Sequence, residues 1–163
     1  MAAGPRERLM LRLAAEAGLR RGEVALVHTN DIKLRSGGQS EYTLVVHGKG
    51  AKVRDVPLNA SLARELLALD PGWAFPGDMN GHISPAWAGK IVTRLLPDGY
   101  TMHKLRHKCA SDAFDVTGGN IYVVKELLGH ANINTTLAYV AKPDDAVRTA
   151  VTAISERRWD AAA

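Results

Sequence analysis

The sequence predicts a mixed fold that is mainly α-helical and carries a small three-stranded antiparallel sheet. Two patterns support this prediction. Most of the chain shows apolar residues at helical spacing, in segments that Gly, Pro or a capping residue separates. Only residues 31–58 alternate apolar and polar side chains with the period of a β-strand. A chain of 163 residues with 46% hydrophobic composition is long enough to fold around one core.

The expected helices are separated by short connections. Pro5 starts the first helix and Gly18 stops it, whereas Asn59, Ser84 and Asn120 each stand where a helix N-cap is expected. We therefore expect helices over 5–18, from 21 onward, over 60–70, 85–96, 102–116, 120–128 and 144–159, a short helix or turn over 132–140, and a packed loop around Trp73, Phe75 and Pro76.

Three short strands are expected around residues 32–34, 42–46 and 53–58. Glycines at 37–38, 48 and 50 supply the turns between them, because glycine adopts positive φ without steric cost. This arrangement places Lys49 at the tip of a hairpin. A lysine in a turn is ordinarily solvated, so a role in chemistry needs further support.

Charge and cysteine content restrict the class of protein. The formal net charge is +4 and the pI is about 9.4, which is compatible with a face that binds phosphates. The single cysteine, Cys109, excludes an internal disulfide and fits a reducing cytoplasm. No apolar run approaches the roughly 18 residues that span a membrane. We therefore expect a cytoplasmic protein without a membrane partner.

The segment from His103 to Tyr139 holds the side chains that phosphoryl transfer requires. Such a reaction needs an in-line nucleophile, positive charge on the non-bridging oxygens and a proton for the leaving oxygen. Tyr139 offers a phenol as nucleophile, and Arg106 offers a permanently charged fork that matches two phosphate oxygens. His103 and Arg106 lie three residues apart, so one helix face presents both.

Each of these residues also has an ordinary structural explanation. A lone tyrosine such as Tyr139 is most often packed in a core, and Gly129-His130 fits the end of a helix. His103 and His107 are four apart, as in zinc proteases, but Lys104 stands where that pattern requires a glutamate. We therefore expect neither a metal nor another cofactor.

Five sequence boxes together resemble the tyrosine recombinase (phage integrase) family, over residues from about 8 to about 142 and in the family's order. The boxes are HKLRH at 103–107, VKELLGH at 124–130, TTLAY at 135–139, GLRRGE at 18–23 and GKGAKVRDVPL at 48–58. The resemblance implies a site-specific DNA recombinase that cuts and rejoins DNA through a 3′-phosphotyrosyl intermediate, without metal or ATP. It favours integration and excision of a phage or mobile element.

The resemblance also implies the catalytic residues: Arg20, Lys49, His103, Arg106, His130 and Tyr139. In this interpretation Tyr139 attacks the phosphate, Lys49 protonates the leaving oxygen, and His103 acts as general base or donor. Arg20 has a structural alternative as a surface residue that caps a helix, and Glu23 could orient it. Further candidate DNA contacts are Lys52, Arg54, Lys90, Arg94 and Lys104.

The expected partner is double-stranded DNA, bound by a tetramer, with accessory DNA-bending or directionality proteins as further candidates. Residues 1–163 would form the C-terminal catalytic domain of a larger recombinase whose N-terminal DNA-clamping domain is absent from this chain. The narrow apolar stripe within 144–159 fits a helix that docks on a partner protomer or on its own domain. Three alternatives share parts of this pattern: a recombinase that resolves chromosome dimers, a type IB topoisomerase, and a DNA-binding module without catalysis.

Overall fold

The computed structural model describes residues 3–34, 42–48, 50, 52–130, 134, 148–149 and 151–153. It confirms the mixed, mainly helical fold with a small antiparallel sheet. The helices are α1 (Pro5–Ala15), α2 (Arg21–Ala25), α3 (Ala60–Leu67), α4 (Pro85–Arg94), α5 (Met102–Val116) and α6 (Ile121–Leu128), with a 3₁₀ turn η1 at Thr29–Asp31. The strands are β1 (Ile32–Leu34), β2 (Tyr42–His47), β3 (Val53–Leu58) and β4 (Pro76–Met79).

Polar side chains cap the starts of four helices, three of them at the predicted N-caps Asn59, Ser84 and Asn120. Asn59 accepts a hydrogen bond from the Leu62 amide at 2.9 Å before α3, and Ser84 accepts one from the Trp87 amide at 3.1 Å before α4. Thr101 before α5 and Asn120 before α6 do the same. Each cap satisfies an amide that has no partner within its own helix. The predicted starts are therefore confirmed, whereas α1, α3 and α4 end two or three residues before the predicted positions.

The sheet has the order β1-β2-β3 and is antiparallel throughout. Val56 pairs with Leu44, and both side chains are buried. Because side chains alternate across a strand, Leu58 lies on the same face of β3 as Val56 and is also buried. This face of the sheet joins the core that α1 and α3 supply.

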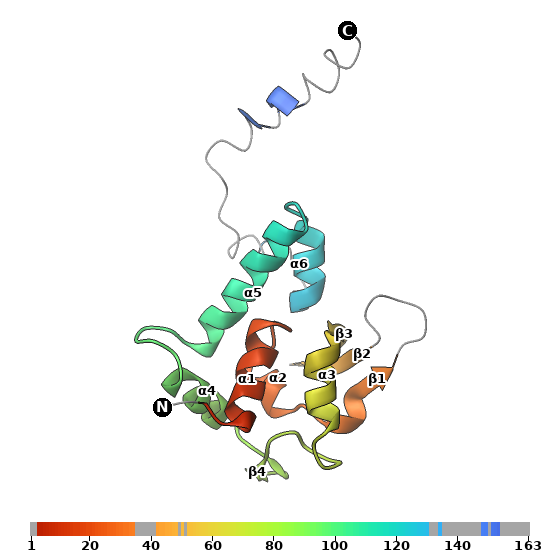
Figure 1. Ribbon diagram of the computed structural model, residues 1–163, viewed down its shortest axis with the longest axis vertical. Coiled ribbons are helices and arrows are strands. Elements are labelled where there is room, and N and C mark those ends of the chain that lie inside the picture. The colour runs from red at the N-terminus through yellow and green to blue at the C-terminus, as the bar shows by residue number, and fades with distance from the viewer. Residues whose placement is uncertain are drawn as a thin grey trace.

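Helix α1 lies in the middle of the molecule, and α5 and α6 lie side by side at one end (Figure 1). The α1 residues Leu9, Met10, Leu13 and Ala14 are all buried. α5 packs on α1, and α4 packs on α2. This packing brings the start of α2, the start of α5 and the end of α6 to one side of the core.

The segment after Trp73 differs in part from the prediction. Phe75 is completely buried, as expected of a packed loop, but residues 76–79 form the short strand β4, which bridges to His82. Proline and glycine at its first two positions gave no strand pattern to detect. Trp73 packs edge-on between His28 and His82, with ring centroids 5.0 and 4.9 Å apart.

No helix in the described part of the chain has the length and apolarity to cross a membrane. The predicted helix or turn at 132–140 lies outside the described residues except for Asn134, and of the predicted helix at 144–159 only residues 148–149 and 151–153, which are helical, are described. The rest of their structure and the docking of 144–159 therefore stay predictions.

Candidate active site

A cleft of about 1640 Å³ opens where α2, the β2–β3 hairpin, α4, α5 and the end of α6 meet. Among the described residues that line it, seven are Lys or Arg and one, Glu23, is acidic. This imbalance suits a polyanion, because each neutralised phosphate contributes to affinity by releasing counterions. The cationic residues of the lining are Arg20, Arg21, Lys52, Arg54, Lys90, Arg94 and Arg106.

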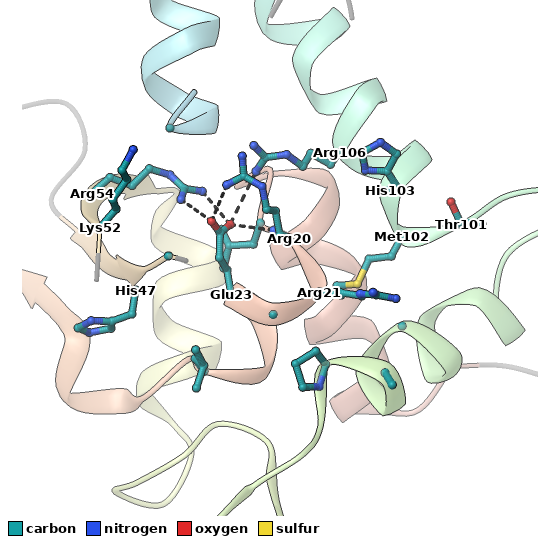
Figure 2. A pocket seen from close by; sticks show the side chains of 18 of the residues that line it. Arg20, Arg21, Glu23, His47, Lys52, Arg54, Thr101, Met102, His103 and Arg106 are labelled. Carbon is teal, nitrogen blue, oxygen red and sulfur yellow. Dashed lines mark hydrogen bonds and ion pairs between the residues drawn. The ribbon is translucent and has the colours of Figure 1, made fainter. Parts of the chain in front are cut away.

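Glu23 is the centre of the cleft's ion pairs, and three guanidinium groups converge on its carboxylate from three different elements (Figure 2). It occupies the third position of α2, where its side chain accepts a hydrogen bond from the Arg20 backbone amide at 2.8 Å. It also accepts one from Arg20 Nη1 at 2.8 Å. The side chain of Glu23 is only 4% exposed, so the surrounding positive charge is what keeps this carboxylate ionised.

The neighbouring positive charges decide the direction in which the pKa of Glu23 is shifted. Burial alone would raise the pKa of this carboxyl group, but hydrogen bonds from Arg54 and from the Arg20 amide outweigh burial and lower the pKa. Glu23 is therefore an anion at neutral pH. It can hold the Arg20 side chain, which is 45% exposed, in one orientation toward the cleft.

Arg106 is almost completely buried, at 1% exposure, on the inner face of α5. Its Nη1 donates to the Gly18 carbonyl and lies 3.7 Å from Glu23 Oε2. Its Nη2 donates to the Leu128 carbonyl at 2.7 Å and lies 3.1 Å from His130 Nε2. These contacts fix the plane of the guanidinium before any ligand binds.

His130 follows the left-handed Gly129, at φ +64°, which ends α6. The imidazole is 6% exposed, and burial together with the charges of the neighbouring arginines lowers the pKa of His130 to about 4. It is therefore neutral at pH 7. Because a guanidinium can only donate, Nε2 must accept from Arg106, and the proton of the neutral ring lies on Nδ1.

His103 and His107 stand one helical turn apart on α5, with ring centroids 4.4 Å apart in an edge-to-face arrangement. His103 is exposed and lines the cleft beside Arg106, whereas His107 is half-buried and does not line it. Burial, followed by the charges of His103 and Arg106, lowers the pKa of His107. No group of three or more potential metal ligands occurs among the residues that the structure describes.

The five candidate DNA contacts differ in position. Lys52, Lys90 and Arg94 are exposed and line the cleft, and Arg94 lies over the Trp87 ring at 5.6 Å. Lys104 is exposed but lies outside the lining, over the Tyr100 ring at 5.1 Å. Arg54 is directed inward, onto Glu23.

The structure thus brings four of the six predicted catalytic residues to one cleft: Arg20, His103, Arg106 and His130. Lys49 and Tyr139 lie outside the described residues. The pairing of Glu23 with Arg20 was expected from the sequence. The pairing of Glu23 with Arg54 and Arg106 was not. A usable signal existed for Arg54, since it lies two and four residues before the inward-facing Val56 and Leu58 on the same strand.

A sequence model of the phage integrase family matches residues 2–145. The chain belongs to the phage integrase family. It is 34% identical over 143 residues to the tyrosine recombinase XerC of Bradyrhizobium diazoefficiens, covering 79% of this chain and 41% of that protein. The chain thus spans less than half the length of this curated relative.

Solved structures show the same fold. The XerH site-specific recombinase bound to difH substrate superposes with a TM-score of 0.73 at 24% identity, over 93% of this chain and 48% of that one. The integrase from mycobacterium phage Brujita superposes with a TM-score of 0.65 at 27% identity, over 80% of this chain and 45% of that one.

Proposed function

We propose that this phage integrase family chain is the catalytic domain of a tyrosine site-specific recombinase that cuts and rejoins double-stranded DNA in the bacterial cytoplasm. The observation that carries the proposal is the convergence of Arg20, Arg106 and His130 on one cationic cleft, although 110 positions separate the first from the last. His103 joins them from the same face of α5 as Arg106.

The reaction is a transesterification in which the number of phosphate ester bonds stays constant. The Tyr139 oxygen bonds to the scissile phosphorus, the bond from phosphorus to the 5′ oxygen breaks, and Lys49 gives that oxygen its proton. The product is a 3′-phosphotyrosyl link and a free 5′ hydroxyl. A 5′ hydroxyl from a second strand reverses the step and completes the exchange. The energy of the broken ester is retained in the protein–DNA link, so the step needs neither ATP nor a metal.

The described residues supply the charge for this step. Arg20 projects toward the cleft, so its guanidinium can bind the non-bridging oxygens of a phosphate. Arg106 is fixed beneath it by the Gly18 and Leu128 carbonyls and places its positive charge under the same phosphate. His130 is neutral and carries its proton on Nδ1, so its contribution is a hydrogen bond rather than a positive charge. His103, at the exposed side of the cleft, is the candidate base or donor for the tyrosine proton.

We further propose that the DNA substrate is an integration or excision site of a phage or mobile element, exchanged within a tetramer with or without accessory DNA-bending proteins. The second candidate is a recombinase that resolves chromosome dimers. Similarity to a protein named tyrosine recombinase XerC supports site-specific recombination under either candidate, and similarity to a phage integrase favours the first. A type IB topoisomerase and a non-catalytic DNA-binding module remain as weaker alternatives.

A nicked suicide DNA substrate tests the chemistry. The protein is incubated with candidate attachment-site DNA in EDTA, and covalent adducts are separated on a denaturing gel. We expect an adduct that persists in EDTA and disappears in Tyr139→Phe. Absence of any adduct, from this chain and from one extended toward the N-terminus, would favour the non-catalytic alternative.

A further inference from the structure

We propose that Arg54 is a positioning residue of this site and not a contact to DNA phosphate. Its hydrogen bonds fix the orientation of the Glu23 carboxylate and the position of the turn that carries His130. The proposal rests on the proposed function for its catalytic consequence.

The first observation is the way Arg54 engages Glu23. Arg54 Nη1 donates to Glu23 Oε1 at 2.7 Å, and Nη2 donates to Oε2 at 3.0 Å. The contact is bidentate, so it fixes the plane of the carboxylate as well as its position. With that plane fixed, Glu23 presents one oxygen to Arg20 at 2.8 Å and the other toward Arg106 at 3.7 Å.

The second observation joins Arg54 to the end of α6. Its Nε donates to the Leu127 carbonyl at 3.2 Å, three residues before His130. The stem of the side chain lies where a side chain at Gly129 would be, because a Cβ built on Gly129 would approach Arg54 Cδ to 2.6 Å. One side chain from β3 therefore contacts both the acid that holds Arg20 and the turn that presents His130.

These contacts leave Arg54 poorly suited to bind DNA. Its side chain is 14% exposed, and all three of its side-chain nitrogens donate to protein oxygens. Lys52, two residues earlier on the same chain segment, is exposed and lines the same cleft. A lysine in place of Arg54 would keep the charge but lose the planar fork and the Nε donor.

Two measurements on the protein with DNA separate positioning from phosphate binding. The first is the slope of log K against log salt concentration for binding to double-stranded DNA, and the second is the rate of adduct formation at saturating suicide substrate. We expect Arg54→Ala and Arg54→Lys to keep the wild-type slope and to lower the rate on the order of 10²-fold, because small misplacements of reacting groups have effects of that size. The matched control is Arg64→Ala, an exposed arginine on α3 outside the cleft lining, which should leave both unchanged.

A third measurement needs no catalysis. Arg54 is one of the charges that hold the pKa of His130 low, together with Arg106 and Arg20, while Glu23 opposes them. Proton NMR should therefore show the His130 midpoint, near pH 4 in the wild type, move upward in Arg54→Ala and stay in place in Arg64→Ala. The midpoint depends on the charge of Arg54 near His130, so it reports their proximity in the folded protein separately from any change in melting temperature.

The outcomes distinguish the two proposals. If wild type forms no adduct, the proposed function fails, while the His130 midpoint still reports on Arg54. If wild type is active and Arg54→Lys restores the rate, or the salt slope falls by about one unit, Arg54 is a phosphate contact and the positioning proposal is wrong. Should Arg54→Ala fail to fold, Arg54→Lys carries the same three tests.

Discussion

Glu23 shows how a single acidic side chain can organise a cationic site. It is buried among Arg20, Arg54 and Arg106, which would repel one another without it. Removing the Glu23 carboxylate would leave three guanidinium groups close together without a compensating anion. Their mutual repulsion would then destabilise the folded protein.

We expect Glu23→Gln, which keeps the shape but removes the charge, to lower the free energy of unfolding by about 3–5 kcal/mol. The control is Glu65→Gln, whose ion pair with Arg12 is half exposed and should contribute less than about 1 kcal/mol. Urea unfolding of both variants at pH 7 makes the comparison. Equal losses in the two variants would show that Glu23 acts as an ordinary surface partner.

The titration of His130 predicts a pH dependence of stability. Its pKa is about 4 in the folded protein and 6.5 as a free side chain, so the unfolded chain binds more protons between these values. Stability from this group is fully present above pH 6.5 and is lost as the pH falls toward 4. We expect urea unfolding of His130→Asn to depend less on pH in that window than unfolding of the wild type. Parallel curves for the two proteins would contradict the neutral His130.

At the scale of elements, the end of α6 depends on a glycine for two separate reasons. Gly129 has φ +64°, and its missing Cβ leaves room for the Arg54 stem. Gly118, after α5, has nearly the same φ of +63°, but no atom lies within 4 Å of the position that a Cβ would take there. A side chain would therefore strain the backbone at both positions. Only at Gly129 would it also clash with a neighbouring side chain.

We expect Gly118→Ala to lower stability by roughly 1–2 kcal/mol, the cost of a left-handed non-glycine residue. Gly129→Ala should cost more than this, because the new methyl group must displace Arg54. It should also slow adduct formation, which Gly118→Ala should not. Thermal unfolding and the suicide-substrate assay measure the two effects, and equal behaviour of the variants would show that the close approach of Arg54 is unimportant.

The helices and strands could be predicted from the sequence more fully than the contacts between the site residues. Caps such as Asn59 and Ser84 and the alternation in β2 and β3 are local signals, and the predicted helices and strands followed from them. Two partners of Glu23 come from residues 31 and 83 positions away, and no local pattern encodes such pairs. The resemblance supplied the list of site residues but left Arg54 among the DNA contacts, although its register with the buried Val56 and Leu58 on β3 was a local signal that it points inward.

For the molecule as a whole, the cleft's charge predicts how DNA binding responds to salt. Lys90 and Arg94 on α4 are exposed cations of the cleft wall. If each contacts one phosphate, Lys90→Ala and Arg94→Ala should each reduce the slope of log K against log salt by about one unit. Fluorescence anisotropy on labelled duplex over a salt series measures the slope, with Arg64→Ala as the control. An unchanged slope would place the DNA path away from α4.

The ion pairs around Glu23 also bear on the order in which the polypeptide is made. The acid lies near the start of the chain, Arg54 comes from the hairpin, and Arg106 is bound by the carbonyl of Gly18, 88 residues earlier, and by that of Leu128. Neighbouring residues alone can form the pair between Arg20 and Glu23, but the contacts of Arg54 and Arg106 require long loops to close first. During synthesis on the ribosome, a nascent chain whose α6 has not yet emerged therefore lacks the Leu128 carbonyl that holds Arg106 and the Leu127 carbonyl that holds Arg54 Nε. An unfinished polypeptide would therefore lack the assembled cationic site.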